Sequence, residues 1–230
     1  TGSTTLTITF NNTATTSDVE DVLQAISFRS TSEDPSTLNR TISLEATDEA
    51  SNTEGANMRI VEVTAQNDPP TLDTNTGTNA DEAGTVNITS GMLAVSDVEQ
   101  GAGALTYTVE VAALNGQLFL DDGDATYDAG DTDLGASGTF TQADIDNGDL
   151  YYIHDGSETA AGDFEFSVSD GAGGAIAQTT FAIGINAQND PPTLDANTGT
   201  NVDEAGTVNI TNSMLAVSDV EQGAGALTYT

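Results

Sequence analysis

The sequence predicts an all-β protein made of β-sandwich domains arranged in series. Three observations predict this class: apolar and polar residues alternate with a period of two, turn-forming runs separate the alternating segments, and a stretch of 42 residues occurs twice. Alternation that involves β-branched and aromatic residues is typical of strands buried on one face. Short strands punctuated by turns are typical of sandwiches.

The alternation predicts strands along the whole chain. It is clearest at 6–10, 42–46 and 164–168, where apolar residues occupy every second position. Further strands are predicted at 24–29, 57–65, 85–88, 104–111, 117–120, 150–153 and 175–186. Runs such as DDGD and SDGAGG lie between the strands, and their residues favour turns.

Two short helical turns are predicted, each directly before a predicted strand. In TSDVEDVLQ, Ser17 and Glu20 have the spacing of a capping box. In TQADIDNG, Thr141 can cap the N-terminus and Gly148 can end the turn. Their shared context predicts that the two turns are the same element in two related domains.

The repeated stretch defines the domain period. Residues 67–108 recur at 189–230, 122 residues further along the chain, and differ only at positions 74, 80, 90 and 91. Such near-identity indicates recent duplication, and the period suits one sandwich domain better than one turn of a solenoid. We expect a complete domain at 67–188, with a front half at 67–108 and a back half at 109–188.

The ends of the chain are predicted to be half domains. Asp48 precedes Asn67 by 19 residues, as Asp170 precedes Asn189, so we expect 1–66 to be the back half of a diverged domain. Residues 189–230 would be the front half of the next repeat. Two explanations remain open: the chain is a window on a longer polypeptide, or its front half pairs with the back half of another molecule to form a head-to-tail filament.

Composition excludes several classes of function. The chain has 37 acidic residues against 3 basic ones, all arginine, for a net charge of −34. Such a chain repels nucleic acid and anionic lipid and attracts cations. With no cysteine it has no disulfide and no thiolate metal site. No stretch approaches the roughly 20 apolar residues of a membrane span, so we expect no direct membrane insertion.

Several motifs occur together in the predicted complete domain and its linkers. They are AVSDVEQGAGALTYT at 94–108, FTQADIDNG at 140–148, LYYIHDGSE at 150–158, DFEFSVSDGAGG at 163–174 and the linker AQNDPP. Together they resemble the chondroitin-sulfate-proteoglycan-type repeat of the cadherin-like superfamily, common in large bacterial surface adhesins. The resemblance implies an Ig-like Greek-key sandwich, calcium at the domain junctions and an extracellular adhesive role, at the cell surface or secreted.

The residues themselves also favour calcium. Calcium prefers six to eight hard oxygen ligands from carboxylates, carbonyls and amides. The chain offers acidic pairs one residue apart, such as Asp97 and Glu99, and an Asn-Asp pair directly before Pro69 and Pro70. Because proline fixes φ and lacks an N–H group, this linker is stiff and cannot continue a sheet.

The resemblance implies a set of calcium ligands at each of two junctions. For the first junction the set is Asn67, Asp68, Asp97, Glu99 and Asp170. For the second it is Glu82, Asp155, Glu158, Asn189, Asp190, Asp219 and Glu221. The acidic loop at 121–133 lacks the spacing of a standard calcium loop and is either a further ion site or a solvated turn. The single histidine, His154, is expected to be a structural residue at a strand end.

Three classes of function remain. The first is a calcium-stiffened structural or adhesive repeat of a large extracellular protein, whose partners are neighbouring repeats, other copies of the chain or a surface ligand. The second is a binding module for carbohydrate or protein, although the chain has no tryptophan. The third is an enzyme such as a glycosidase that uses two carboxylates. No acid stands out as catalytic, so we expect no enzymatic activity.

Overall fold

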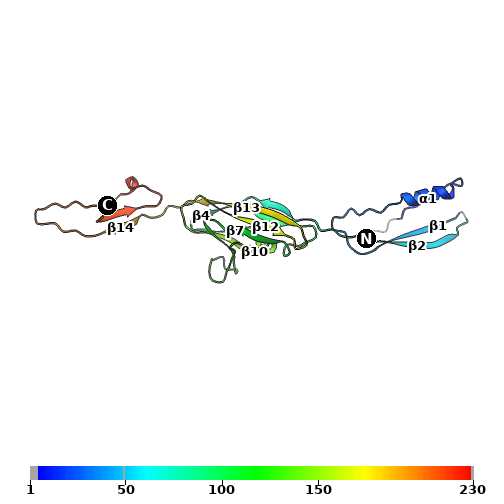
Figure 1. The fold of residues 1–230 in the computed structure, drawn as a ribbon, viewed down its shortest axis with the longest axis horizontal. Coiled ribbons are helices and arrows are strands. Elements are labelled where there is room, and N and C mark those ends of the chain that lie inside the picture. The colour runs from blue at the N-terminus through cyan, green and yellow to red at the C-terminus, as the bar shows by residue number, and fades with distance from the viewer. Residues whose placement is uncertain (1–4, 49, 229–230) are drawn as a thin grey trace. The chain divides into compact units, whose positions relative to one another are not determined.

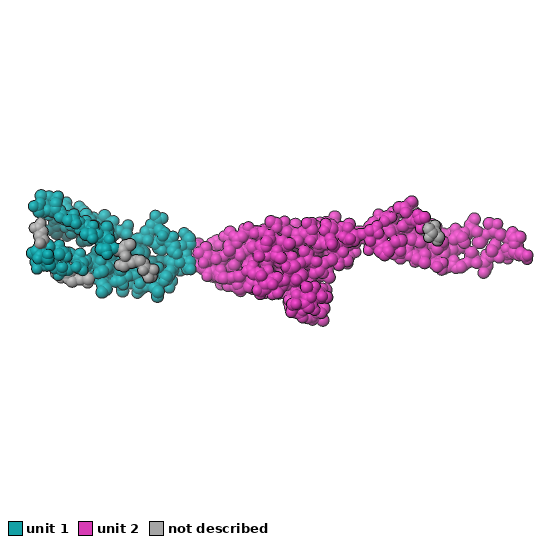
Figure 2. Space-filling view, turned by 180° about the vertical axis from the view of Figure 1, so that it is seen from behind, with its two compact units in different colours: residues 1–66 teal, residues 67–230 magenta. Residues whose placement is uncertain are grey.

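The computed structural model describes residues 5–48 and 50–228 and divides the chain into two compact units, Thr1–Gln66 and Asn67–Thr230 (Figure 2). Unit 1 contains helix α1 (Thr16–Ala25) and strands β1 (Arg40–Thr47) and β2 (Thr53–Val61). The two strands form an antiparallel hairpin (Figure 1). None of the helices in the described part of the chain is long and apolar enough to cross a membrane.

Unit 2 holds all the other elements. Its strands are β3 (Thr71–Asn75), β4 (Thr78–Asp81), β5 (Thr85–Asn87), β6 (Leu93–Ser96), β7 (Thr106–Val111), β8 (Gly116–Leu120), β9 (Thr132–Asp133), β10 (Thr139–Thr141), β11 (Leu150–His154), β12 (Ala161–Ser169), β13 (Ala175–Asn186), β14 (Thr193–Asn197) and β15 (Leu215–Ser218). Its helices are α2 (Gln142–Asn147) and the 3₁₀ turn η1 (Ala224–Ala226).

Two sheets of unit 2 form a sandwich, which confirms the predicted all-β class. One sheet has the strand order β10-β7-β12-β13-β4, and the other has the order β5-β11-β8-β9. Neighbouring strands are antiparallel except β13 and β4, which are parallel. The core lies between the sheets because each supplies its apolar face, with Phe164 and Phe166 from the first and Leu118 and Tyr152 from the second.

Both α-helices begin with a capping box. At α2, Thr141 and Asp144 form the box and Gly148 ends the helix with a left-handed backbone, as the sequence predicts. At α1 the predicted pair Ser17 and Glu20 is wrong, because Thr15 and Asp18 form the box instead. Several overlapping Thr, Ser, Asp and Glu residues offer this spacing, so the sequence leaves the register open.

The predicted strands of unit 2 are all present, whereas two of those in unit 1 are wrong. The segments 6–10 and 24–29 are not strands, although both carry apolar residues. A strand needs a hydrogen-bonding neighbour, and neither segment pairs with another described segment of unit 1. Alternation did not predict seven short strands, namely β3, β4, β6, β9, β10, β14 and β15.

The hairpin of unit 1 has the same register as the β12–β13 hairpin of unit 2. Every residue pair of β1 and β2 corresponds to a pair of β12 and β13 after a shift of 122 residues. For example, Ile42 faces Arg59 as Phe164 faces Phe181. Even the bulge between Leu44 and Ala46 recurs between Phe166 and Val168. The shift is the one that relates the duplicated stretches.

Candidate functional site

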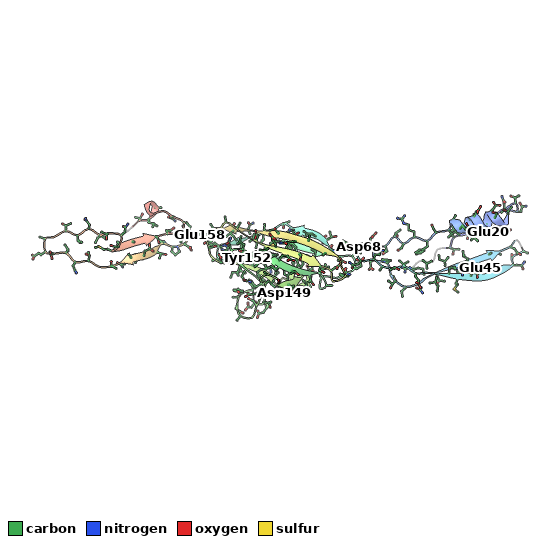
Figure 3. All side chains as sticks on the ribbon, viewed as in Figure 1. Glu20, Glu45, Asp68, Asp149, Tyr152 and Glu158 are labelled. Carbon is green, nitrogen blue, oxygen red and sulfur yellow. The ribbon has the colours of Figure 1, made fainter. Side chains whose placement is uncertain are left out.

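Two groups of acidic residues lie at opposite ends of the sandwich, as the labels of Asp68 and Glu158 show in Figure 3. We call them the Asp170 cluster and the Glu82 cluster. The Asp170 cluster consists of Asn67, Asp68, Asp97, Glu99 and Asp170. The Glu82 cluster consists of Glu82, Glu158, Asp190 and Glu221.

Hydrogen bonds join the Asp170 cluster to the linker that enters the sandwich. The side-chain amide of Asn67 donates to Oδ2 of Asp170 at 2.6 Å. The backbone N–H of Asp68 donates to Oε2 of Glu99 at 3.2 Å. The backbone N–H of Glu99 in turn donates to Oδ1 of Asp97 at 2.8 Å. The structure therefore brings together all five residues that the resemblance implied for the first junction.

Asp170 anchors this cluster. Its side chain is 3% exposed, and its Oδ1 accepts the N–H groups of Ala172, Gly173 and Gly174 at 2.7, 3.0 and 3.0 Å. The hydrogen bond from Asn67 lowers the pKa of Asp170 below its usual value, and the three backbone N–H groups act in the same direction. Asp170 is therefore held as a carboxylate that fixes the linker.

The turn after Asp170 also touches the linker backbone. A Cβ atom placed on Gly174 would lie 2.6 Å from Cα of Pro69 and 3.1 Å from the carbonyl oxygen of Asp68. Only glycine permits this close approach between turn and linker. The glycines of SDGAGG were the sequence signal for it, although the sequence did not show which backbone they approach.

The acidic side chains of the Asp170 cluster do not converge on one point. Within the described residues, no three of them lie close enough together to share an ion. One buried oxygen, Oε1 of Glu99, accepts no hydrogen bond. The cluster is thus a hydrogen-bonded junction in which one buried carboxylate oxygen, Oε1 of Glu99, has no partner among the described residues.

The Glu82 cluster differs because its carboxylates do converge. One oxygen each from Glu82, Glu158 and Asp190 lies within 4.8 Å of the other two. Glu82 directly follows β4, and its Oε2 accepts the backbone N–H of Gln188 at 2.9 Å. The backbone N–H of Asp190 donates to an oxygen of Glu221 at 2.8 Å. Residues from the sandwich, the linker and the second front half therefore meet in one place.

The like charges of the Glu82 cluster repel one another. Burial raises the pKa of Glu158, and the negative charges of Glu82, Glu221 and Asp190 raise it further. The described residues of unit 2 include no lysine or arginine that could neutralise the cluster. Carboxylate oxygens at this spacing are the ligands that calcium prefers, and a bound cation would remove the repulsion.

A buried histidine holds the backbone beside the Glu82 cluster. The Nδ1 atom of His154 accepts the N–H groups of Ala83 and Gly156, both at 3.2 Å. Its Nε2 atom lies 3.1 Å from the hydroxyl of Thr159. Because Nδ1 accepts twice, the ring has its proton on Nε2. The structural role agrees with the prediction for His154, and its two partners lie next to the predicted ligands Glu82 and Asp155.

The other predicted ligands of the second junction lie beside the cluster. Asp155 points its Oδ1 at the backbone N–H of Ser157, at 2.9 Å, and is not among the three convergent carboxylates. Asp219 accepts the N–H of Glu221 at 3.2 Å, as Asp97 does for Glu99. The amide of Asn189 donates to the carbonyl oxygen of Asp190 at 2.9 Å.

The acidic loop between β8 and β9 forms a third group of carboxylates. Oxygens of Asp121, Asp122 and Asp124 lie within 4.8 Å of one another. Oδ2 of Asp121 accepts the N–H groups of Gly123 and Ala125, while its Oδ1 is buried without a partner. Burial and the neighbouring aspartates raise the pKa of Asp122. The loop projects from the sandwich and is drawn in green in Figure 1.

The sandwich and its linkers have the features of a known family. A cadherin-like family model matches residues 70–185, which span the strands from β3 to β13. The chain belongs to the cadherin-like family. This match confirms the resemblance from which the candidate site residues were chosen.

The cadherin-like chain is also similar to curated proteins. It is 29% identical over 161 residues to the extracellular matrix organizing protein FRAS1 of Mus musculus, and 28% identical over 174 residues to that of Homo sapiens. These matches cover 70% and 75% of the chain. It is 39% identical over 85 residues, 37% of the chain, to human chondroitin sulfate proteoglycan 4. The matches cover 4%, 4% and 3% of the relatives' own lengths.

These relatives bear on two predictions about the cadherin-like chain. The chain is extracellular, as the sequence predicts. The three relatives come from Mus musculus and Homo sapiens, so the likeness to bacterial surface adhesins stays a prediction. The chain is thus a cadherin-like structural or adhesive repeat.

Proposed function

We propose that the chain is a repeat segment of a large extracellular protein and that calcium stiffens the connections between its repeats. The observation that carries this proposal is the convergence of Glu82, Glu158 and Asp190 within 4.8 Å. Two of these carboxylates belong to the complete sandwich, and Asp190 belongs to the linker that leaves it. A cation bound there would tie the linker to the sandwich.

The physical effect follows from the charges. Without a cation, repulsion among the carboxylates favours conformations in which the linker moves away from the sandwich. Extracellular calcium sites bind with a Kd of about 10⁻⁴ to 10⁻³ M. At about 100 times Kd, one bound ion adds roughly 2.7 kcal/mol to the free energy of unfolding. That is a large share of the roughly 5–15 kcal/mol of a typical domain.

The cluster suits an ion better than a chemical reaction. Glycoside hydrolysis uses a pair of carboxyl groups that flank the scissile bond, whereas the Glu82 cluster contains four carboxylates, Glu82 included. We therefore infer that the repeat is not an enzyme. Most large aromatic side chains of the sandwich pack inside it, as in the stacked pair Tyr107 and Phe140. The exposed ones, Phe10, Phe28 and Tyr127, are divided between the two units and give the binding-module alternative little support.

The test is thermal unfolding of the full chain during a calcium titration, with magnesium and chelator as controls. We expect calcium to raise the melting temperature of the wild type much more than magnesium does. Glu82→Gln and Glu158→Gln should each remove most of this rise. Glu45→Gln, which changes an exposed carboxylate on β1, should leave it intact.

Small-angle scattering of the same samples tests the stiffening itself. We expect calcium to narrow the distribution of conformations in the wild type and to have less effect in the Glu82→Gln variant. Equal scattering profiles with calcium and with chelator would refute the stiffening. No thermal response to calcium would refute the ion sites as well.

A further inference from the structure

The buried His154 lies between the two segments of the sandwich that carry carboxylates of the Glu82 cluster. Glu82 lies in the turn between β4 and β5, and Glu158 lies in the loop between β11 and β12. Along the chain these two carboxylates are 76 residues apart. Their convergence therefore depends on how the turn and the loop are held against each other.

The end of β11 holds the turn through two hydrogen bonds of His154. Nδ1 of the ring accepts the backbone N–H of Ala83, which directly follows Glu82, at 3.2 Å. The backbone N–H of His154 donates to the carbonyl oxygen of Gly84 at 3.0 Å. Ala83 has a φ of 54°, in the left-handed region that residues other than glycine seldom adopt. The hydrogen bond to the ring therefore supports the turn at its least favourable residue.

The same ring holds the loop on both sides of Glu158. Nδ1 also accepts the backbone N–H of Gly156, at 3.2 Å. Nε2 lies 3.1 Å from the hydroxyl of Thr159, the residue that directly follows Glu158. The turn and the loop approach each other closely here, since a Cβ on Gly156 would lie 3.6 Å from Cβ of Ala83. One imidazole ring thus contacts the residue next to each of the two carboxylates.

The ring itself offers no ligand for an ion. Its side chain has no exposed surface, and both of its nitrogens have hydrogen-bond partners. Because Nδ1 accepts, the proton is on Nε2, which donates it to Thr159. Oδ1 of Asp155 lies 3.8 Å from Nε2, which is too far for a hydrogen bond. His154 can therefore act on the cluster only through the backbone that it holds.

We propose that His154 is the positioning residue of the Glu82 cluster and that it raises the affinity of the cluster for calcium. The inference rests on the proposed function, because it requires the cluster to bind the ion. The ring holds Glu82 and Glu158 close together before an ion arrives, although their negative charges repel. A site that is already arranged loses less conformational freedom when it binds. Residues that orient metal ligands in this way typically contribute about 10- to 100-fold to affinity.

Substitution of the ring tests the proposal in the full chain. His154→Leu fills similar space without a polar atom, so the Kd for calcium should rise roughly tenfold or more. Isothermal titration calorimetry measures the Kd at a temperature at which the variant is folded. Magnesium serves as the control ion.

Two amide variants separate the hydrogen bonds from the bulk of the ring. In His154→Asn the amide oxygen takes the place of Nδ1 and can accept from Ala83 and Gly156. In His154→Gln the amide reaches toward Thr159, and no acceptor is left at the place of Nδ1. We therefore expect the asparagine variant to bind calcium more tightly than the glutamine variant. Equal affinities in these two variants would overturn the proposal, and this comparison does not require the leucine variant to fold.

Leu105→Ala is the control for a general loss of stability. Leu105 is buried in the core and lines a hollow together with Asp97 of the Asp170 cluster. Its substitution should lower the melting temperature in chelator without changing the Kd for calcium. If Leu105→Ala weakened calcium binding as much as His154→Leu, the effect would be one of stability and the positioning role would be wrong.

Hydrogen exchange in chelator tests the positioning without calcium. By NMR, the amides of Ala83 and Gly156 should exchange faster in His154→Leu than in the wild type, because they lose their acceptor. Unchanged exchange at both amides would overturn the proposal. Calcium binding that is equal in the wild type and all His154 variants would overturn it while leaving the proposed function intact. A wild type that binds no calcium would refute the proposed function and this inference together.

Discussion

The two front halves have nearly the same sequence and different structures. Residues 67–108 form β4 and β5, whereas the corresponding segments 200–203 and 207–209 form no strand. By contrast, β14 and β15 pair in the same register as β3 and β6, including the bulge. Some of the strands therefore belong to the front half itself, and others do not.

The difference is explained by the partner of each strand. β3 and β6 pair with each other inside the front half, so their counterparts form the same hairpin without help. β4 and β5 pair with β13 and β11 of the back half, and the second front half has no such neighbours in its unit. A strand of this kind is thus specified by a contact distant in sequence, whose closure depends on the folding of the whole domain.

The largest expected effect comes from making the same substitution separately in each of the two front halves. Ile88→Ala should lower the free energy of unfolding of unit 2 by about 2–5 kcal/mol, because it leaves a cavity in the core. Ile210→Ala should change it by less than about 0.5 kcal/mol, because Ile210 is exposed. Urea unfolding followed by tyrosine fluorescence measures both, since Tyr107 and Tyr152 lie in the core. Similar losses of stability in the two variants would contradict the burial of Ile88 and the exposure of Ile210.

The next effect concerns the linker of the complete domain. Gly174→Ala should cost about 1–3 kcal/mol by overpacking, because the added methyl group would overlap Pro69. In unit 1 the corresponding position is Asn52, whose amide donates to Asp48 at 2.8 Å. The control is Gly101→Ala, where a Cβ meets no atom within 4 Å. Denaturant unfolding measures the stability of both variants. If Gly101→Ala lowered the stability as much as Gly174→Ala, the loss could not be attributed to the close approach between Gly174 and Pro69.

Removal of a helix cap should have a smaller effect on stability, and the effect should differ between the two units. Thr141→Ala should lower the stability of unit 2 by about 1 kcal/mol, because α2 buries Gln142 and Ile145 in the sandwich. Thr15→Ala removes the same type of cap from α1, which has no buried residue, and should leave the unfolding of unit 2 unchanged. The same urea titration measures both variants. A loss of equal size from Thr15→Ala would show that α1 contributes to the core.

The smallest effect is a pH dependence of the Glu82 cluster. The pKa of Glu158 is raised in the folded chain, so the folded state binds a proton more readily than the unfolded state. In chelator, stability should therefore rise as the pH falls from neutral through the raised pKa toward the usual value for glutamate. Calcium must displace that proton, so its stabilising effect should shrink over the same range. Melting temperatures at several pH values measure this, and a Glu158→Gln variant with an unchanged profile would contradict it.

Every strand that the sequence predicted in the complete domain is present, but the short strands β3, β4, β6, β9 and β10 were not predicted. In unit 1, two of the predicted strands are absent. The segments 85–88 and 150–153 are strands because they pair with each other. The segment 6–10 has equally regular alternation and is no strand in its unit. Alternation reports which residues can line a core, and it does not report whether a neighbouring strand is present.

The candidate site, too, could be predicted from the sequence only in part. The carboxylates that the family resemblance implied include all four residues of the Glu82 cluster. The spacing of these residues along the sequence could not predict that Glu82, Glu158 and Asp190 converge. It also could not predict that Asp155 accepts a hydrogen bond from Ser157. The role of Gly174 was hidden for the same reason, since Pro69 lies 105 residues away along the chain.

By itself, the sequence determined the sandwich class, the repeat period, the acidic charge and the types of residue at the site. These depend on local periodicity and on composition, which each segment carries wherever it is placed. Only the tertiary structure decided which segments become strands and which carboxylates meet. Backbone hydrogen bonds between distant strands and like charges brought within a few ångströms exist only once the chain has folded, because both require a partner that the local sequence does not contain.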